Sequence, residues 1–353
     1  MNPIDWPEPA RQTILLDWLN ALAEAQGLRP ETLRLAHADA STRRYLRVDR
    51  QGGGSRIVMD APPQHGSMRA FVDVGAQLAA CGLHVPEVLD FAEDRGLLLL
   101  SDLGEQPYLQ ALQQASAGEA DRLMRDAIGA LIRWQGGGDA SRLPVYDEAF
   151  IRRELQIFVD WCVGREFGRQ WNETQQAWWE KTCAALVRSM LAQPQVPMHR
   201  DFMVRNLMVC PAEAGNPGIL DFQDAVRGPI AYDMASLLRD AFISWDEERE
   251  LDWAIRYWEQ ARKAGLLAEH EFGEDFGAFW RALEWAGLQR HLKILGIFCR
   301  LKHRDGKPAY AEDLPRLFAY AIKVSTRYIE LSPLTRLLED LQGHLTQTGF
   351  SLR

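Results

Sequence analysis

The chain has 353 residues, of which 47% are hydrophobic and 25% are charged, so it is long enough to form two lobes around a sizeable core. Its formal net charge of -9 argues against nucleic acid as a main partner, because a phosphate backbone demands basic patches. The five cysteines are scattered without a CxxC pair, so neither a zinc site nor a disulfide framework is expected. With no secretory signal pattern and no apolar run of membrane-spanning length, we expect a cytoplasmic protein without a membrane partner.

The first hundred residues predict a helix followed by several strands. Apolar residues recur at helical spacing over residues 11–26, and Gly27 follows as a stop signal. Short apolar runs typical of strands come next, with one more helical pattern among them. The strands are predicted at 33–36, 45–48, 56–60, 88–91 and 97–100, and the helix at 67–81.

Beyond residue 105 the pattern becomes mainly helical. Helices are predicted at 119–134, 148–164 and 174–191, and over most of residues 247–345. Polar residues gather in this last part at 289–293 and 300–307, where they either bind a substrate or coat a helix surface.

One stretch between these helices carries a chemical signature. His199 and Asp201 are followed by Asn206, an apolar strand at 207–209, a Pro/Gly turn and a second apolar strand that ends in Asp221. This order and spacing is what a kinase needs to place one base and two metal ligands around a transferring phosphate. Asp201 is the candidate base, and Asn206 and Asp221 are candidate ligands of Mg²⁺, a hard cation that takes oxygen ligands. The alternative is a solvated loop with accidental spacing.

The same residues resemble a known superfamily. His199-x-Asp201 with its downstream Asn206 and Asp221-Phe222 is similar to the aminoglycoside phosphotransferase and choline kinase superfamily, relatives of the protein kinases. Longer strings resemble the anomeric amino-sugar kinases, which phosphorylate N-acetylmuramate and N-acetylglucosamine at C1 in cell-wall recycling. These strings lie at 39–45, 59–63, 220–224 and 300–307, and together they span nearly the whole chain.

The resemblance implies a fold and a set of ligands. The fold is of the α+β class, bilobal and protein-kinase-like. A small nucleotide-binding lobe with an antiparallel sheet is expected at residues 1–103, and a larger, mainly helical catalytic and substrate lobe at residues 104–353. ATP would be the phosphate donor, Mg²⁺ the cofactor and a small-molecule sugar the acceptor. No feature indicates an obligate protein partner.

Candidate nucleotide contacts follow from the same resemblance. A turn between the first two strands takes the place of the glycine-rich loop of kinases, and its side chains would meet the phosphates unless it is only a polar hairpin tip. A hinge between the lobes would bind adenine through its backbone. These candidates are Ser41, Thr42, Arg43 and Arg44 in the turn, and Leu100 and Asp102 at the hinge.

Further residues are expected to support the reaction. His199 would brace the catalytic loop, and Asp233 would anchor its backbone, although an acid at the start of a helix also suits the helix dipole. Arg205 and Asp224 are candidate substrate-binding residues. Arg205 would meet the γ-phosphate or remain a surface arginine, and Asp224 would bind metal or a sugar hydroxyl.

The sequence also departs from the kinase pattern. It has no GxGxxG loop, and the predicted strand at 56–60 lacks the lysine that usually holds the α and β phosphates, so phosphate charge falls to Arg43, Arg44 or the metal. Two rival functions therefore stay open. One is a kinase of an aminoglycoside, choline or a related cationic alcohol, which would need an acidic substrate pocket. The other is a catalytically dead nucleotide-binding regulator, against which the intact base and metal set argues.

Overall fold

A computed structural model describes residues 4, 6, 8–37, 43–62 and 68–347. The chain divides into two compact units, one formed by Met1–Gln106 with Met208–Asp224, the other by Pro107–Leu207 with Ala225–Arg353. The chain thus leaves the first unit once and returns to it for one short segment. Whether residues 1–103 act as the nucleotide lobe and residues 104–353 as the catalytic lobe stays a prediction.

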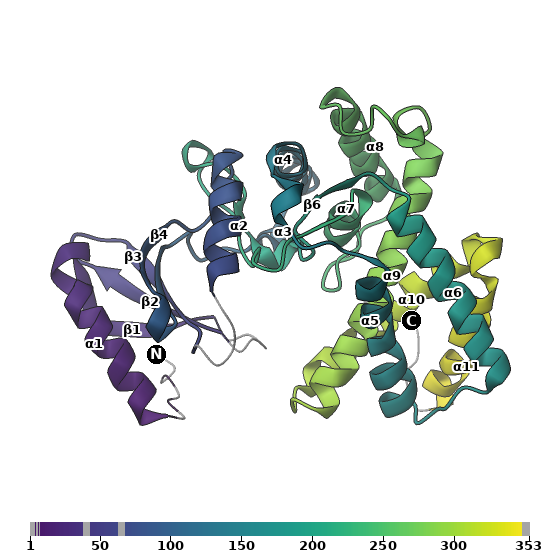
Figure 1. The fold of residues 1–353 in the computed structure, drawn as a ribbon, viewed down its shortest axis with the longest axis horizontal. Coiled ribbons are helices and arrows are strands. Elements are labelled where there is room, and N and C mark those ends of the chain that lie inside the picture. Colours follow the sequence, from purple (N-terminus) through teal and green to yellow (C-terminus); the bar gives the residue numbers. More distant parts are fainter. Residues whose placement is uncertain (1–3, 5, 7, 38–42, 63–67, 348–353) are drawn as a thin grey trace. The chain divides into compact units, whose positions relative to one another are not determined.

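The first unit is built on a five-stranded antiparallel sheet (Figure 1), as the sequence predicts. Its strand order is β1-β2-β3-β5-β4, so neighbours in the sheet are mostly neighbours in sequence. The strands are β1 (Leu28–His37), β2 (Arg44–Arg50), β3 (Ser55–Asp60), β4 (Val88–Ala92) and β5 (Leu97–Ser101).

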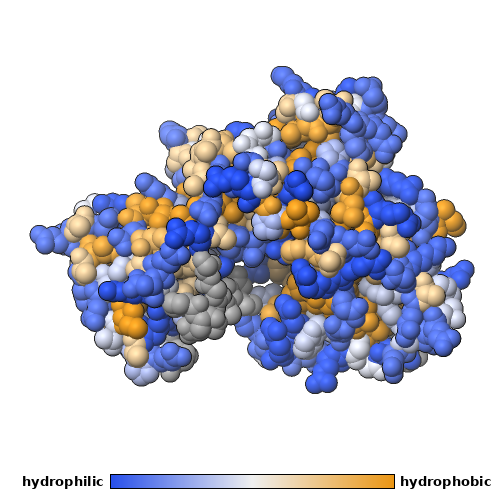
Figure 2. Space-filling model, viewed as in Figure 1, coloured by the Kyte–Doolittle hydropathy of each residue, from blue (hydrophilic) through white to orange (hydrophobic). Residues whose placement is uncertain are grey.

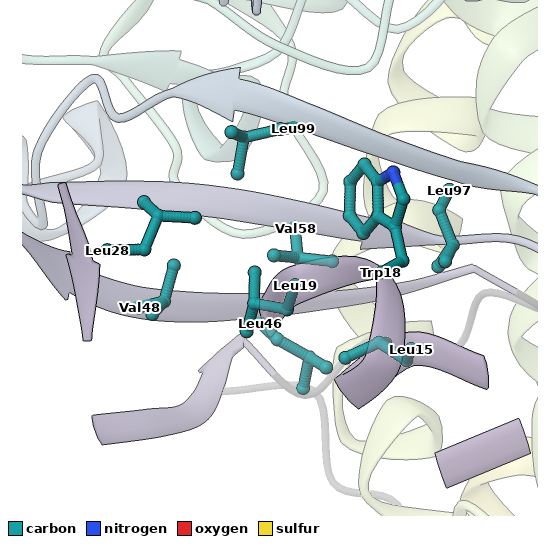
Figure 3. Packing of buried hydrophobic residues seen from close by; sticks show 9 residues of the cluster. All are labelled: Leu15, Trp18, Leu19, Leu28, Leu46, Val48, Val58, Leu97 and Leu99. Atoms are coloured by element: carbon teal, nitrogen blue, oxygen red, sulfur yellow. The ribbon is translucent and has the colours of Figure 1, made fainter. Parts of the chain in front are cut away.

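Helix α1 (Pro9–Gln26) covers one face of this sheet. Figure 3 shows Leu15, Trp18 and Leu19 of α1 packed among leucine and valine side chains of the strands. Val58 of β3 and Leu99 of β5 belong to this core. Because side chains alternate between the faces of a strand, their sequence neighbours project from the face opposite α1. On that second face lie Tyr45, Arg47, Ile57, Met59, Leu98 and Leu100.

A returning segment completes the first unit. Strand β7 (Leu207–Met208) pairs with β8 (Gly218–Ile219), and β8 in turn bridges to His84. The Ile219 N–H donates to the His84 carbonyl at 2.8 Å. Behind it, Phe222 packs against Phe71 of α2 (Arg69–Ala80), with ring centroids 4.7 Å apart. The segment that carries Asp221 is therefore part of the sheet-containing unit, far in sequence from its other members.

The second unit is mainly helical, as predicted. Its small sheet pairs β6 (Gln195–Met198) with β9 (Val226–Pro229). Its helices are α3 (Tyr108–Gln114), α4 (Ala117–Gly137), α5 (Glu148–Ile157), α6 (Glu173–Leu191), α7 (Ala231–Leu238), α8 (Glu247–Lys263), α9 (Phe276–His303), α10 (Leu314–Arg327) and α11 (Ser332–Gln347).

One predicted helix differs from the structure in its second half. Instead of one α-helix over 148–164, α5 ends at Ile157 and the chain continues as a π-helix, Phe158–Glu166. The wider turn brings the backbone at Ile157 against α9 at Gly296. A Cβ on Gly296 would lie 2.4 Å from the Ile157 carbonyl oxygen, so only glycine permits this approach.

Helix α9 is the central element of the second unit. It packs against α5, the π-helix, α6, α7, α8 and α10, and most of its 28 residues are buried. The polar run at 289–293 lies within this buried part, where each residue is at most 6% exposed. The expectation that this run coats a helix surface is wrong, because neighbouring helices cover α9 on all sides there. Buried polar groups in such a place need partners.

The visible surface of each unit is largely hydrophilic, with hydrophobic side chains in scattered patches (Figure 2). Among the described residues, the most exposed large hydrophobic side chain is that of Ile329, at 83%. A search of the same residues finds no helix with the length and apolar character needed to cross a membrane.

Candidate active site

The loop from His199 to Asn206 follows strand β6 and folds back on itself. Arg200 has a positive φ of 74°, a backbone conformation that is uncommon for residues other than glycine, and it turns the loop sharply. The Asn206 side chain then donates through Nδ2 to the Asp201 carbonyl at 2.9 Å. With its amide nitrogen used inside the loop, the oxygen of the same amide is the atom that the predicted metal contact would use.

Two buried carboxyl groups hold this loop from behind. Asp233 of α7 accepts the backbone N–H groups of His199 at 2.6 Å and Arg200 at 2.9 Å. Asp240, just after α7, accepts the Val204 N–H at 3.1 Å. Burial raises the pKa of Asp233 to about 7, although the two N–H donors act in the opposite direction. These acids fix the backbone on both sides of Asp201.

His199 lies inside the fold rather than at the surface. Its side chain is 1% exposed, and its ring meets Phe202 edge-on with centroids 5.7 Å apart. Nδ1 accepts the backbone N–H of Asp201 at 3.3 Å. The histidine therefore contacts the loop backbone on the side of Asp201, which is the geometry of a brace.

Asp201 itself presents a partly exposed carboxylate, with 32% of its side chain accessible. Burial alone would raise the pKa of Asp201. The positive charges of Lys293, Arg290 and Arg200 outweigh burial and hold this pKa below its ordinary value. Asp201 is therefore ionised at neutral pH, with these three cations around it.

A buried polar network holds two of these cations. Glu154 of α5 accepts hydrogen bonds from Lys293 at 2.9 Å and from Arg200 at 2.8 Å. Tyr146 and Gln289 donate to its other oxygen, at 2.5 and 3.2 Å. Burial opposes ionisation, but Lys293 and Arg200 lower the pKa of Glu154 to about 2. One carboxylate thus partners two buried cations.

Sequence reasoning missed most of this network. Glu154 lies 47 residues before Asp201 in a helix whose pattern shows nothing unusual, so no sequence signal marked it. Lys293 and Arg290 were visible only as members of a polar run in an otherwise apolar helix. A run of that kind in the middle of a long apolar helix is the signal that could have identified them.

Asp221 is described within the first unit. It follows β8 with a positive φ of 60°, the second such conformation outside glycine among the described residues. Its side chain is exposed and accepts from Gln223 Nε2 at 2.7 Å. Asp224, three residues on, is exposed as well. Strained backbone at such a position costs roughly 1–3 kcal/mol and persists at functional sites more often than elsewhere.

The chemistry of the donor set fits a hard cation. Asn206 offers an amide oxygen and Asp221 a carboxylate, which are the ligand types that Mg²⁺ takes beside water and substrate phosphates. Within the described part of the chain, no three or more His, Cys, Asp or Glu side chains gather as they would at an all-protein metal site. The residues present therefore suit a metal bound partly by phosphate.

The candidate nucleotide contacts are described only in part. Ser41 and Thr42 lie outside the described residues, and Arg43 is half-buried. Arg44 forms an ion pair with the fully buried Asp60, which Arg11 of α1 also contacts at 2.8 Å. Arg44 thus turns toward the α1 face, where its guanidinium pairs with a buried acid, and the nucleotide contact stays a prediction.

The hinge candidates are both well packed. Leu100 is 1% exposed and lies on the sheet face opposite α1. The Asp102 carboxylate accepts from Arg47 Nε at 2.6 Å and from Ser55 Oγ at 2.6 Å, and the Gly104 N–H adds a third contact at 2.9 Å. Burial by itself would raise the pKa of Asp102, but these donors lower it. The side chain thus fixes the hinge and leaves the predicted adenine contact to the backbone.

Arg205, a candidate substrate contact, lies in the second unit, just before Asn206 in the same loop. Its guanidinium carbon is 4.5 Å from the centre of the Phe242 ring. This stacking holds the side chain in one orientation while leaving it partly exposed.

Three comparisons with known proteins bear on this arrangement. The N-acetylmuramate/N-acetylglucosamine kinase of Neisseria meningitidis is 44% identical to this chain over 343 residues, which cover 97% of this chain and 99% of the relative. The protein of the same name from Pseudomonas aeruginosa is 46% identical over 342 residues, with coverages of 95% and 98%. A solved choline/ethanolamine kinase family protein from Mesorhizobium loti matches with a TM-score of 0.61 at 13% identity, covering 93% of this chain and 99% of that one.

The structural match confirms the predicted α+β class and kinase-like fold, and at that identity it speaks for the fold alone. A family model described as the phosphotransferase enzyme family matches residues 32–272, more than half of the chain. With the two relatives above, this match also establishes the kind of reaction. The chain belongs to the phosphotransferase enzyme family, and it is a kinase.

Proposed function

We propose that this protein is an ATP- and Mg²⁺-dependent sugar kinase that phosphorylates the anomeric C1 hydroxyl of N-acetylmuramate, N-acetylglucosamine or both. The product is the sugar 1-phosphate, within the recycling of cell-wall sugars. The names of the relatives at 44% and 46% identity support the sugar substrate. The loop geometry around Asp201 supports the reaction.

The observation that carries the choice of acceptor is the charge around Asp201. The side chains of Arg200, Arg290 and Lys293 are 15%, 2% and 8% exposed, and all three lower the pKa of Asp201. A cationic alcohol such as choline or an aminoglycoside needs carboxylates that can pair with it, and the buried carboxylates behind Asp201 are already engaged by these cations or by loop N–H groups. An uncharged or anionic sugar has no such need. N-acetylglucosamine is uncharged, and N-acetylmuramate carries a carboxylate.

The carboxylate of Asp201 would orient the anomeric hydroxyl and accept its proton late in the transfer. A positioned general base contributes on the order of 10²- to 10⁴-fold. An anomeric hydroxyl is more acidic than an ordinary alcohol, so a carboxylate with a lowered pKa is a sufficient base. His199 and Asp233 would keep the loop in place through their contacts with its backbone.

The remaining roles concern the donor. Asn206 and Asp221 would hold Mg²⁺, which, when bound, neutralises charge on the β and γ phosphates. Arg205 would meet the γ-phosphate, and Asp224 would bind the metal or a sugar hydroxyl. The nucleotide would be bound by the side chains of Ser41, Thr42, Arg43 and Arg44 and by the backbone at Leu100 and Asp102.

A product assay tests the proposal. The purified protein is incubated with ATP, Mg²⁺ and either N-acetylmuramate, N-acetylglucosamine, choline or kanamycin, and products are followed by mass spectrometry. We expect phosphorylated sugar that no longer reacts as a reducing sugar, since C1 is blocked. Asp201→Asn, which keeps the size of the side chain, should abolish it.

Other products would contradict the proposal in distinct ways. Product from choline or kanamycin alone would establish the cationic-alcohol kinase instead. A phosphorylated sugar that keeps its reducing end would place the phosphate on another hydroxyl. Nucleotide binding without product from any acceptor would favour a regulator.

A further inference from the structure

Arg290, near the middle of α9, is the most deeply buried cation beside the catalytic loop. It is 2% exposed, and its Nη1 lies 3.7 Å from Asp201 Oδ1. Its Nη2 lies 3.4 Å from the sulfur of Met203. Both partners belong to the loop between His199 and Asn206, so the guanidinium faces this loop directly.

The guanidinium is poorly paired for so buried a group. Among the described residues, Met203 and Asp201 are the only side chains with which the guanidinium forms a hydrogen bond or an ion pair, and the buried Nε has no hydrogen-bond partner. Thioether sulfur is a weak acceptor, and 3.7 Å is too long for a hydrogen bond. A buried arginine is ordinarily matched by close oxygen acceptors, because burying an uncompensated charge is costly. Arg290 therefore needs an explanation other than a local ion pair.

Three carboxyl groups around the loop favour the charged form of Arg290. Burial lowers the pKa of Arg290, and Asp201, Asp240 and Asp233 are among the groups that raise it above its ordinary value. Two of these acids hold the backbone of the loop, Asp233 at His199 and Arg200, and Asp240 at Val204. The third is the candidate base. One guanidinium thus lies beside the base and within electrostatic reach of both loop anchors.

We infer that Arg290 is a positioning residue for phosphoryl transfer, which holds the carboxylate of Asp201 toward the acceptor and, through its contacts with Asp201 and Met203, steadies the loop that Asp233 and Asp240 anchor. This inference rests on the proposed role of Asp201. A direct contact between Arg290 and the sugar is a weaker explanation, because so little of the side chain is accessible. Lys293, the neighbouring cation, is already paired with Glu154.

Kinetics of two substitutions test the inference. Arg290→Met removes the charge at similar length, and Arg290→Lys keeps the charge but loses the planar fork. We expect kcat to fall about 10²-fold in Arg290→Met, the effect of a slightly misplaced catalytic group. KM values for sugar and ATP should stay near those of the wild type, and Arg290→Lys should retain more kcat than Arg290→Met. A KM increase with unchanged kcat would show substrate contact and overturn the inference.

Arg239→Lys is the matched control. Arg239 is also about 1% exposed and lies in the same unit, but its side chain pairs with Glu250 and Glu284. It should lose thermal stability while its kcat stays close to that of the wild type. An equal fall of kcat in Arg239→Lys would mean that losing any buried guanidinium weakens the unit, and this would overturn the inference.

Hydrogen exchange separates this inference from the proposed function. Asp233 and Asp240 accept hydrogen bonds from the backbone N–H groups of His199, Arg200 and Val204. These amide protons should exchange faster in Arg290→Lys than in the wild type, and their exchange rates should be unchanged in Arg239→Lys. This readout needs no substrate and uses the variant more certain to fold. If the wild type phosphorylates no sugar, the proposed function fails while exchange still decides whether Arg290 holds the loop; unchanged exchange in Arg290→Lys would overturn the inference.

Discussion

At the scale of single residues, one carboxylate carries much of the charge balance behind the catalytic loop. Glu154 is 5% exposed and accepts from both Lys293 and Arg200. Removing one member of a buried ion network leaves the others without compensation, and this costs more than the network contributes over an apolar replacement. The stability of the helical unit should therefore depend on the ionisation of this one side chain.

The pKa of Glu154, lowered to about 2 from an ordinary 4.5, fixes the sign of the pH dependence. Its stabilising effect is complete above the unfolded pKa and is lost as pH falls from about 4.5 toward 2. We expect Glu154→Gln to lower the unfolding free energy at pH 7 by roughly 3–5 kcal/mol. The difference in unfolding free energy between the wild type and Glu154→Gln should become smaller as pH falls from 4.5 to 2. Urea unfolding at several pH values measures this difference.

Glu148→Gln provides the control for this experiment. Glu148 lies in the same helix and pairs with Arg152, but 56% of its side chain is exposed. Its substitution should change stability by less than about 1 kcal/mol at any pH. A Glu154→Gln gap that stays constant from neutral to acidic pH would show that the carboxylate acts through shape rather than charge.

At the scale of elements, the contact between α9 and the π-helix sets the position of the buried polar run. Gly296 lies one turn beyond Lys293, and the backbone of Ile157 and Phe158 fills the place of a side chain at Gly296. Because the obstructing atoms are backbone rather than a flexible side chain, they have little room to move. Glycine at position 296 therefore allows α9, the helix that carries Arg290, to pack closely against the backbone of Ile157 and Phe158.

Gly296→Ala should therefore lower the thermal midpoint, at a cost of about 1–3 kcal/mol or more for overpacking. Gly129→Ala is the opposite control. Gly129 lies within α4, and a Cβ there would meet nothing within 4 Å, so alanine should add roughly 0.5–1 kcal/mol through helix propensity. Equal midpoints for the two variants would mean that α9 can move away from the π-helix without cost.

At the scale of the whole molecule, the sheet-containing unit is assembled from two distant segments. Residues 208–224 supply β8, whose Ile219 bonds to His84, and Phe222, which packs on Phe71. A second small core joins Leu103 to Met208 and Cys210. Without the returning segment, these groups would lose their partners and expose apolar surface.

A fragment of residues 1–106 should accordingly be less stable than the same fragment joined through a Gly/Ser linker to residues 208–224. We expect the joined fragment to unfold cooperatively, and the shorter one to bind a hydrophobic dye and to melt at lower temperature. The control is the joined fragment in which the 17 residues 208–224 follow the Gly/Ser linker in scrambled order. Equal stability of the fragments with native and scrambled segments would show that the returning segment adds nothing to this unit.

The sequence by itself determined what is local. Helices and strands follow from apolar periodicity over a few neighbouring residues, and most predicted elements lie close to observed ones. The exceptions are the π-helical end of α5, the longer β1, and α3, β6 and β9, which were not predicted. The loop from His199 to Asn206 could be recognised from the sequence for the same reason, because the candidate base and one candidate metal ligand lie within eight consecutive residues. The roles proposed for them remain predictions.

Only the tertiary structure decided what surrounds Asp201. Arg290 follows it by 89 residues and Glu154 precedes it by 47, and no periodicity records that helices α5 and α9 bring them together. A polar run in the middle of α9 gave the same local pattern whether it faced water or the core. The physical reason is that burial and charge pairing depend on packing between segments far apart in the sequence. That packing places the Asp201 carboxylate among buried cations.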